Sequence, residues 1–170
     1  MINGRVRWRL SIEDRFALQD LIAANAWALD TGDIEALVAC FTTDAQLVKE
    51  VFEDPYVWHG HDGICALATH YAQATGFPGR QHHTAQLQFT PQSADVCAMR
   101  SFAFVTECHG EPPYLLRFAA WYDDLAVRGD DGQWRFARRA IRLWDGPVLA
   151  NFPGHGQWVP RKRPPELRRS

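Results

Sequence analysis

The sequence has few cysteines and no long hydrophobic run. Its longest unbroken apolar segment is far shorter than the roughly 20 residues that a membrane-spanning helix needs, so we expect no membrane partner. The four cysteines are far apart and form no Cys-x-x-Cys pair. Reduced thiols and the lack of an apolar signal segment are typical of cytoplasmic proteins, and we therefore expect a cytoplasmic location.

The sequence also lacks the short motifs of several enzyme classes. It contains no Gly-x-Gly-x-x-Gly or P-loop for nucleotides, no Gly-x-Ser-x-Gly for serine hydrolases and no His-Glu-x-x-His for zinc peptidases. The net charge is only −2, but the basic residues gather at both ends and leave an acidic body. An acidic body disfavours nucleic acid as a partner, because phosphate binding requires a basic surface.

Aromatic residues, in contrast, are abundant. They make up 12% of the 170 residues and include seven Trp and ten Phe. Such side chains fill cores, but they also line pockets for flat apolar ligands. The length predicts a single domain with its own core, spanning residues 1–170 and including an N-terminal extension (1–10) and a Pro/Gly-rich C-terminal strap (146–170).

Helical patterns come first along the chain and strand-like patterns follow. Ser11 and Asp14 resemble a capping box before a helical pattern that ends at Thr31-Gly32, and Asp33 caps a second, short helix. A third helix is predicted over residues 64–74, after a turn at 60–63. The predicted strands cover residues 45–51, 56–59, 82–90, 94–108, 114–127 and 134–144. Short turns between long strands predict antiparallel hairpins, and the order of elements predicts an α+β fold.

Two titratable groups stand out at the ends of predicted elements. Asp30 lies in the last turn of the first helix, where a carboxylate opposes the helix dipole. It is either an ordinary turn residue or a desolvated carboxylate that can orient or hold a proton. His82 and His83 begin a strand whose alternation sends their rings to opposite faces, so at most one of them faces a concave interior. The other interpretation of each is a surface histidine or a hydrogen-bonded core histidine.

Arginines are concentrated on the last predicted strand. Strict alternation puts Arg139 on one face and Arg138 and Arg142 on the other; the first face also carries Ala137, Ile141 and Leu143, and the second Trp134, Phe136 and Trp144. One of these arginines is expected inside, where it needs an anionic partner or ligand.

His59 and His61 have the spacing of two metal ligands on one face of a strand. No carboxylate follows at the spacing of the cupin metal motif, so a pair of loop histidines is the favoured interpretation. We therefore predict neither a metal nor another cofactor. A metal enzyme that uses this pair with His82 or His83 is the alternative.

Four segments together resemble the SnoaL-like branch of the NTF2-like superfamily. They are the first helix with its end at Ala28–Asp33, then Leu37–Ala45, His82–Leu87 and Asp131–Phe136, and the resemblance covers residues 12–143. It implies an α+β cone in which a curved antiparallel sheet wraps around the N-terminal helices and encloses a deep apolar pocket.

The resemblance also implies the position of a catalytic dyad. In scytalone dehydratase, hexachlorocyclohexane dehydrochlorinase and bile-acid 7α-dehydratase, an Asp closes the first helix and pairs with a His that begins the strand after the third helix. These positions are Asp30 and His82 here, since the amide residue of the family follows four positions later at Gln86. The inward Arg of the dehydrochlorinase falls on Arg139. Five residues before that Asp, two of these lineages have a Lys or a Tyr. This sequence has Asn25 there, and an Asn side chain cannot carry a proton at neutral pH.

The implied function is that of a cofactor-independent lyase or isomerase acting on a small, cyclic, largely apolar substrate. His82 would remove a proton next to an activating group, Asp30 would orient the ring, and Arg139 would bind a carbonyl oxygen or leaving group. Asn25 is predicted to hydrogen-bond the substrate, and the predicted pocket walls are Trp27, Tyr56, Phe77 and Trp121.

The alternative is a non-catalytic ligand-binding or assembly module. The small subunit of ring-hydroxylating dioxygenases resembles this fold and has a mainly structural role. In either case the strand faces with Trp134, Phe136 and Trp144 favour a homo-oligomer, a dimer or a trimer.

The C-terminal strap carries aromatic residues between prolines and glycines. Phe152 and Trp158 are expected to anchor it over the pocket mouth or on a neighbouring subunit. His155 is interpreted as an exposed loop histidine.

Overall fold

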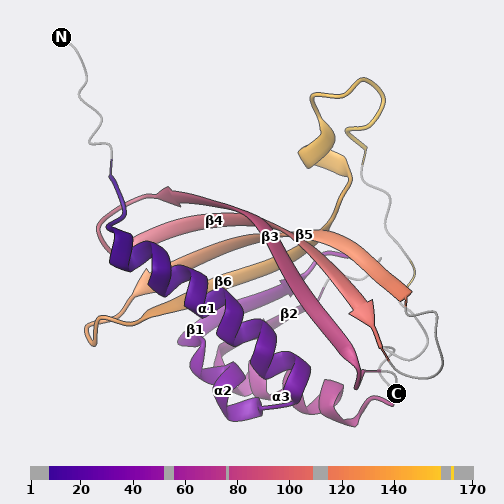
Figure 1. The fold of residues 1–170 in the computed structure, drawn as a ribbon, viewed down its shortest axis with the longest axis horizontal. Coiled ribbons are helices and arrows are strands. Elements are labelled where there is room, and N and C mark those ends of the chain that lie inside the picture. The colour runs from indigo at the N-terminus through magenta and orange to yellow at the C-terminus, as the bar shows by residue number, and fades with distance from the viewer. Residues whose placement is uncertain (1–7, 52–55, 76, 109–114, 158–161, 163–170) are drawn as a thin grey trace.

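The computed structural model describes residues 8–51, 56–75, 77–108, 115–157 and 162. Three helices lie against one side of a single curved sheet, as Figure 1 shows. The architecture is α+β and NTF2-like, as predicted. No helix in the described ranges is both long and apolar enough to cross a membrane.

Helix α1 (Ile12–Thr31) and helix α2 (Ile34–Ala39) have the predicted boundaries at their shared turn. The Ser11 hydroxyl accepts a hydrogen bond from the Asp14 backbone N–H at 2.9 Å, which caps the start of α1. Gly32 ends the helix with φ +73°, a left-handed conformation that glycine adopts without steric cost. Asp33 accepts from the Ala36 N–H at 3.0 Å and begins α2.

Helix α3 (Gly60–Gln73) begins four residues before the predicted start, so the predicted turn at 60–63 is wrong. Its two glycines are close-approach residues. A Cβ on Gly60 would lie 2.9 Å from the Thr43 carbonyl oxygen, and one on Gly63 would lie 3.1 Å from the Trp58 backbone. Glycine therefore allows the first turn of α3 to pack tightly on the chain beside it.

The sheet has six strands in the order β2-β1-β6-β5-β4-β3. They are β1 (Phe41–Lys49), β2 (Tyr56–His59), β3 (Arg80–Pro91), β4 (Val96–Glu107), β5 (Leu115–Arg128) and β6 (Trp134–Leu143). A 3₁₀ turn (Gly146–Leu149) follows. β1 and β6 are parallel and every other pair is antiparallel, so the prediction of a purely antiparallel sheet is wrong at this pair. Patterns of sequential hairpins carry no information about two strands that pair across about ninety residues.

A bulge in β6 changes which arginine faces the interior. Ala126 pairs with Phe136 and Leu125 with Arg138, so Ala137 has no partner in the register. The extra residue places Phe136 and Arg139 on the same face, with the Arg139 guanidinium carbon 4.6 Å from the ring centre. Strict alternation wrongly assigned these two residues to opposite faces.

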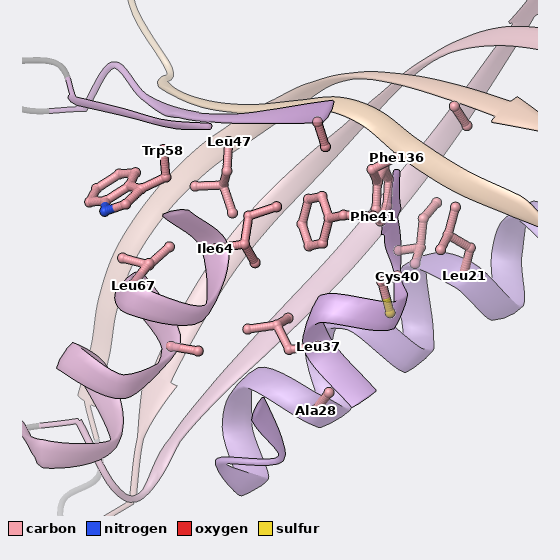
Figure 2. Packing of buried hydrophobic residues seen from close by; sticks show 14 of the residues in the cluster. Leu21, Ala28, Leu37, Cys40, Phe41, Leu47, Trp58, Ile64, Leu67 and Phe136 are labelled. Atoms are coloured by element: carbon pink, nitrogen blue, oxygen red, sulfur yellow. The ribbon is translucent and has the colours of Figure 1, made fainter. Parts of the chain in front are cut away.

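The core lies between the helices and the concave face of the sheet. Figure 2 shows residues of α1, α2 and α3 converging on β1 and β6, where the Phe41 and Phe136 rings lie 5.5 Å apart. Trp134 is also buried, and its indole N–H donates to Asp14 at 2.9 Å. Trp134 and Phe136 therefore fill this chain's own core and do not form an exposed face for another subunit, contrary to the prediction.

The described C-terminal strap is exposed from Ala150 onward. Residues 151–157 all lie at the surface, and Phe152 is 61% exposed. Phe152 is thus not anchored over the pocket mouth of this chain, and the alternative, an anchor on a neighbouring subunit, stays a prediction. His155 is exposed, as expected. Trp158 and residues 1–7 of the N-terminal extension lie outside the described residues.

Candidate active site

Asp30 and His82 are in direct contact. Asp30 comes from the last turn of α1 and His82 from the start of β3, and one carboxylate oxygen lies 2.5 Å from Nδ1 of the imidazole. The other carboxylate oxygen accepts a hydrogen bond from the His82 backbone N–H at 2.6 Å. A carboxylate only accepts hydrogen bonds, so Nδ1 carries the proton and Nε2 is left with a lone pair.

Local structure positions the histidine. Gly79, with φ +90°, turns the chain after Phe77, and the Arg80 N–H donates to the Phe77 carbonyl oxygen at 3.2 Å. The Phe77 ring is buried, stacks on Tyr71 at 4.4 Å and lies 6.0 Å from the His82 ring. The imidazole is therefore held between a carboxylate and an aromatic pair.

A second buried polar cluster surrounds Arg139. Nη1 of Arg139 lies 3.4 Å from a carboxylate oxygen of Asp124, and the guanidinium carbon lies 3.8 Å from the centre of the Tyr122 ring. Burial raises the pKa of Asp124 to about 7, although the charge of Arg139 opposes that rise. Burial also raises the pKa of Tyr122.

The two clusters meet at a small cavity of about 50 Å³. Apolar residues of α1, α2, α3, β1 and β6 form much of its wall, and the polar residues that line it are Asn25, Lys49, His82, Tyr122 and Arg139. Asn25 is buried, and its side-chain N–H group has no hydrogen-bond partner among the described residues. The cavity thus brings together three of the predicted site residues, Asn25, His82 and Arg139.

Two wider hollows on the surface are both lined by Asp30. A groove of about 770 Å³ between α1 and β3 is lined by Trp27, Asp30 and His82, among others. A hollow of about 280 Å³ at the end of α1 is lined by Asp30, Tyr71 and Phe77. His82 therefore borders both the small cavity and the wider groove.

Not every predicted pocket wall lines the cavity. Trp121 precedes the inward Tyr122 on β5 and so points to the other face, where its indole N–H donates to the Leu143 carbonyl oxygen at 3.1 Å. Tyr56 lies on the edge strand β2, half exposed, against Trp58. Trp27 is 75% exposed and borders the groove only. The assignments of Tyr56 and Trp121 to the pocket wall are therefore wrong, whereas Trp27 borders the groove and its contact with substrate stays a prediction.

The other histidines make contacts away from the cavity. His83 points to the outer face of the sheet, where it stacks on Phe104 at 4.6 Å and contacts the Thr106 hydroxyl at 2.9 Å. A ring nitrogen of His61 lies 3.0 Å from the Phe41 carbonyl oxygen, and His59 is exposed. In the described ranges no group of three or more His, Cys, Asp or Glu side chains could hold a metal ion.

Sequence reasoning missed Lys49, Tyr122 and Asp124. Each is a polar residue inside a strand that is otherwise apolar on its inner face, and that contrast is a usable signal. The predicted strand 45–51 ran past Lys49, and the prediction that Trp121 faces the pocket assigned its neighbour Tyr122 to the other face. Both predictions concealed the signal.

Comparisons with known proteins agree with this fold. The family profile described as the SnoaL-like domain matches residues 10–140. An NTF2-like protein with a cystatin-like fold from Novosphingobium aromaticivorans is similar at 26% identity, covering 82% of this chain and 88% of its own, with a TM-score of 0.68. No curated protein matches the sequence.

Two further solved structures share the fold at lower identity. One is Rv3472 of Mycobacterium tuberculosis, a protein of unknown function, with 24% identity, coverage of 84% and 78%, and a TM-score of 0.68. The other is a candidate scytalone dehydratase from Novosphingobium aromaticivorans DSM 12444, with 23% identity, coverage of 77% and 84%, and a TM-score of 0.64.

Proposed function

The chain belongs to the SnoaL-like domain family, and on that premise we propose that it is a cofactor-independent lyase or isomerase for a small, cyclic, largely apolar carbonyl compound. The observation that carries the proposal is the contact between Asp30 and Nδ1 of His82 at 2.5 Å. It leaves Nε2 as a base at the border between a small cavity and a wider groove.

In the proposed reaction His82 takes a proton from the carbon next to the carbonyl group. The imidazolium that forms is stabilised by the Asp30 carboxylate, which also keeps the ring in its reactive tautomer. The pair of electrons left on carbon moves toward the carbonyl oxygen. Arg139 and Asn25 offer N–H groups inside the cavity to the negative charge that develops there.

The sizes of the spaces support a particular placement of the substrate. The small cavity of about 50 Å³ has room for the oxygen-bearing end of a molecule, and the groove of about 770 Å³ has room for an apolar ring. Because His82 borders both spaces, a substrate that extends from one to the other passes its nitrogen. Trp27, which lines the groove, would contact the apolar part.

The proposal is tested with a panel of cyclic hydroxy-ketones and halogenated cyclic compounds. The chain itself is compared with Asp30→Asn, His82→Ala and the control His155→Ala, whose side chain is exposed and lines none of the three spaces described above. We expect the first two variants to lose about 10²–10⁴-fold in kcat/KM and the control to lose little. If the chain turns over a panel compound and both variants keep its full rate, the dyad has no catalytic role.

A non-catalytic assembly module is the second candidate, and one observation favours it. The outer face of the sheet exposes Phe102, Phe104 and Trp144, and the Phe102 and Trp144 rings pack edge to face at 4.6 Å. Exposed aromatic clusters of this kind mark protein contacts. A chain resembling the dioxygenase small subunit would need a larger partner, whereas a chain that purifies alone as a soluble homo-oligomer favours the first proposal.

A further inference from the structure

Lys49 lines the same small cavity as His82. It is the last residue of β1 and pairs with Ile141 on β6. The pair of Leu47 and Arg139 lies two residues earlier, on the same face of the sheet. Three strands separate β1 from β3, the strand of His82, yet both side chains line the same cavity because the sheet curves around it. The cavity therefore has a titratable group from each of these two strands.

A buried phenol orients the Lys49 side chain. Its ammonium group is hydrogen-bonded to the hydroxyl of Tyr71 and lies 3.9 Å from the centre of that ring. Tyr71 is 3% exposed and is itself fixed by stacking on Phe77. The chain of contacts from Lys49 through Tyr71 and Phe77 ends beside His82, so the positions of the two titratable groups are mechanically linked.

The proposed reaction requires a proton donor, and the other polar residues of the cavity supply one poorly. Tyr122 lines the cavity, but burial raises the pKa of its phenol, so it gives up its proton less readily than an exposed tyrosine. A hydroxyl group leaves carbon readily only when it receives a proton as its bond breaks. Asn25 cannot provide one at neutral pH, and an arginine side chain does not release its proton in a protein. A lysine ammonium group carries three N–H donors and becomes a neutral amine when it gives one up.

We propose that Lys49 is the general acid of this cavity, acting on the hydroxyl leaving group of a β-hydroxy ketone, and that Tyr71 is its positioning residue. This inference rests on the proposed function, because it supplies the second half of a reaction that His82 begins. It also narrows the substrate to compounds with a hydroxyl group two carbons from the carbonyl group.

The step balances in atoms and charge. Nε2 of His82 takes the proton from the carbon between the two functional groups, and the electron pair of that C–H bond forms the C=C bond. The C–O bond to the hydroxyl breaks, and its oxygen takes a proton from the Lys49 ammonium group and leaves as water. His82 is then protonated and Lys49 neutral, and transfer of one proton between them through solvent restores the starting state.

Two substrates with the same product separate the acid from the base. Both 3-hydroxycyclohexanone and 3-acetoxycyclohexanone eliminate to 2-cyclohexenone, which is followed by its ultraviolet absorbance. Acetate leaves as a stable anion, so its departure needs the base alone. We expect Lys49→Met to lower kcat/KM for the hydroxy compound about 10²-fold or more and to leave the rate of the acetoxy compound nearly unchanged.

Three further variants complete the design. Lys49→Arg keeps the charge but gives up its proton poorly, so it should behave like Lys49→Met. Tyr71→Phe keeps the ring and loses the hydroxyl, and we expect about a tenfold loss on the hydroxy compound only. The chain has one other lysine, Lys162, which is exposed, and Lys162→Met should change neither rate. Retained elimination of acetate shows that each variant is folded.

The outcomes distinguish the two proposals. A selective loss on the hydroxy compound supports Lys49 as the acid. If Lys49→Met lowers both rates by the same factor, or lowers neither, while His82→Ala abolishes both, Lys49 is not the acid and the function of the dyad stands. If the chain and His82→Ala convert both compounds equally slowly, the proposed function is wrong and the role of Lys49 is overturned with it.

Discussion

The carboxylate of Asp30 binds His82 at two points, the ring Nδ1 at 2.5 Å and the backbone N–H at 2.6 Å. One interaction sets the tautomer of the imidazole and the other fixes the first residues of β3 against the end of α1. The same side chain therefore links fold and chemistry. Asp30 is positioned by helix α1 alone. The position of His82 depends in addition on the turn at Phe77–Gly79, which brings β3 back to the helix.

The tautomer of His82 provides a test that requires no substrate. We expect ¹⁵N NMR of the chain to show His82 protonated at Nδ1 and bare at Nε2, because the carboxylate accepts the Nδ1–H bond. In Asp30→Asn the amide can also donate, so the population with the proton on Nε2 should rise. His83, which lies on the other face, serves as the internal reference. An unchanged His82 spectrum in the variant would contradict the geometry.

The sequence permits prediction of the parts of this structure that depend on local signals. The caps at Ser11 and Asp33, the left-handed Gly32 and the hairpins of β3 to β6 each follow from short patterns. Strand alternation predicts that one of the three arginines lies inside, and the family resemblance assigns that position to Arg139, which is buried. Resemblance to a family added Asp30 and His82, which neither composition nor periodicity distinguishes from ordinary turn and strand residues.

What could not be predicted depends on contacts between distant segments. The bulge at Ala137 leaves no mark in the alternation of β6, yet it decides which side chains share a face with Phe136. The parallel pairing of β1 with β6 carries Lys49 to the cavity wall, and nothing near Lys49 in the chain indicates that pairing. The prediction that Trp121 forms a pocket wall is wrong for the same reason, because a shift of one residue in strand register exchanges the faces of Trp121 and Tyr122.

Gly60 should be one of the positions least tolerant of a side chain. Its φ is +63°, and an added Cβ would lie 2.9 Å from the Thr43 carbonyl oxygen, so Gly60→Ala forces both strain and a backbone clash. Gly132 has a similar φ of +78° with open space around it, and Gly132→Ala is the matched control. In thermal unfolding we expect a loss of about 1 kcal/mol for the control and clearly more for Gly60→Ala. Equal losses would show that Thr43 moves aside easily.

The outer face of the sheet should mediate self-association if the exposed rings bind a second copy of the chain. Phe102→Glu places a charge beside Trp144 and should lower the sedimentation coefficient to that of a monomer. Phe16 on α1 is 61% exposed and lies away from that face, so Phe16→Glu is the control and should leave the oligomer intact. A chain that is monomeric without any substitution would remove the homo-oligomer from the proposal.

The pair of Asp124 and Arg139 should make the stability of the protein depend on pH in an unusual direction. Burial raises the pKa of Asp124 from 3.8 to about 7, so the folded state binds a proton that the unfolded state releases between these values. A group with a raised folded-state pKa stabilises the fold fully below the unfolded-state value, and this contribution is lost as pH rises through the folded-state value. The free energy of unfolding should therefore fall from about pH 4 to about pH 7.

Comparison with Asp124→Asn isolates this contribution from the other acidic groups. The variant carries a neutral side chain of the same shape. We expect its free energy of unfolding, relative to that of the unsubstituted chain, to increase as pH rises through about 7. Urea titrations of both proteins at several pH values measure this difference. Asp131→Asn is the control, because the pKa of that exposed carboxyl is lowered to about 2 by its hydrogen bonds with Arg135, so it stays ionised across the range. If the Asp124 difference is constant with pH, the carboxylate is already charged at pH 4, and Arg139 outweighs the cost of burying it.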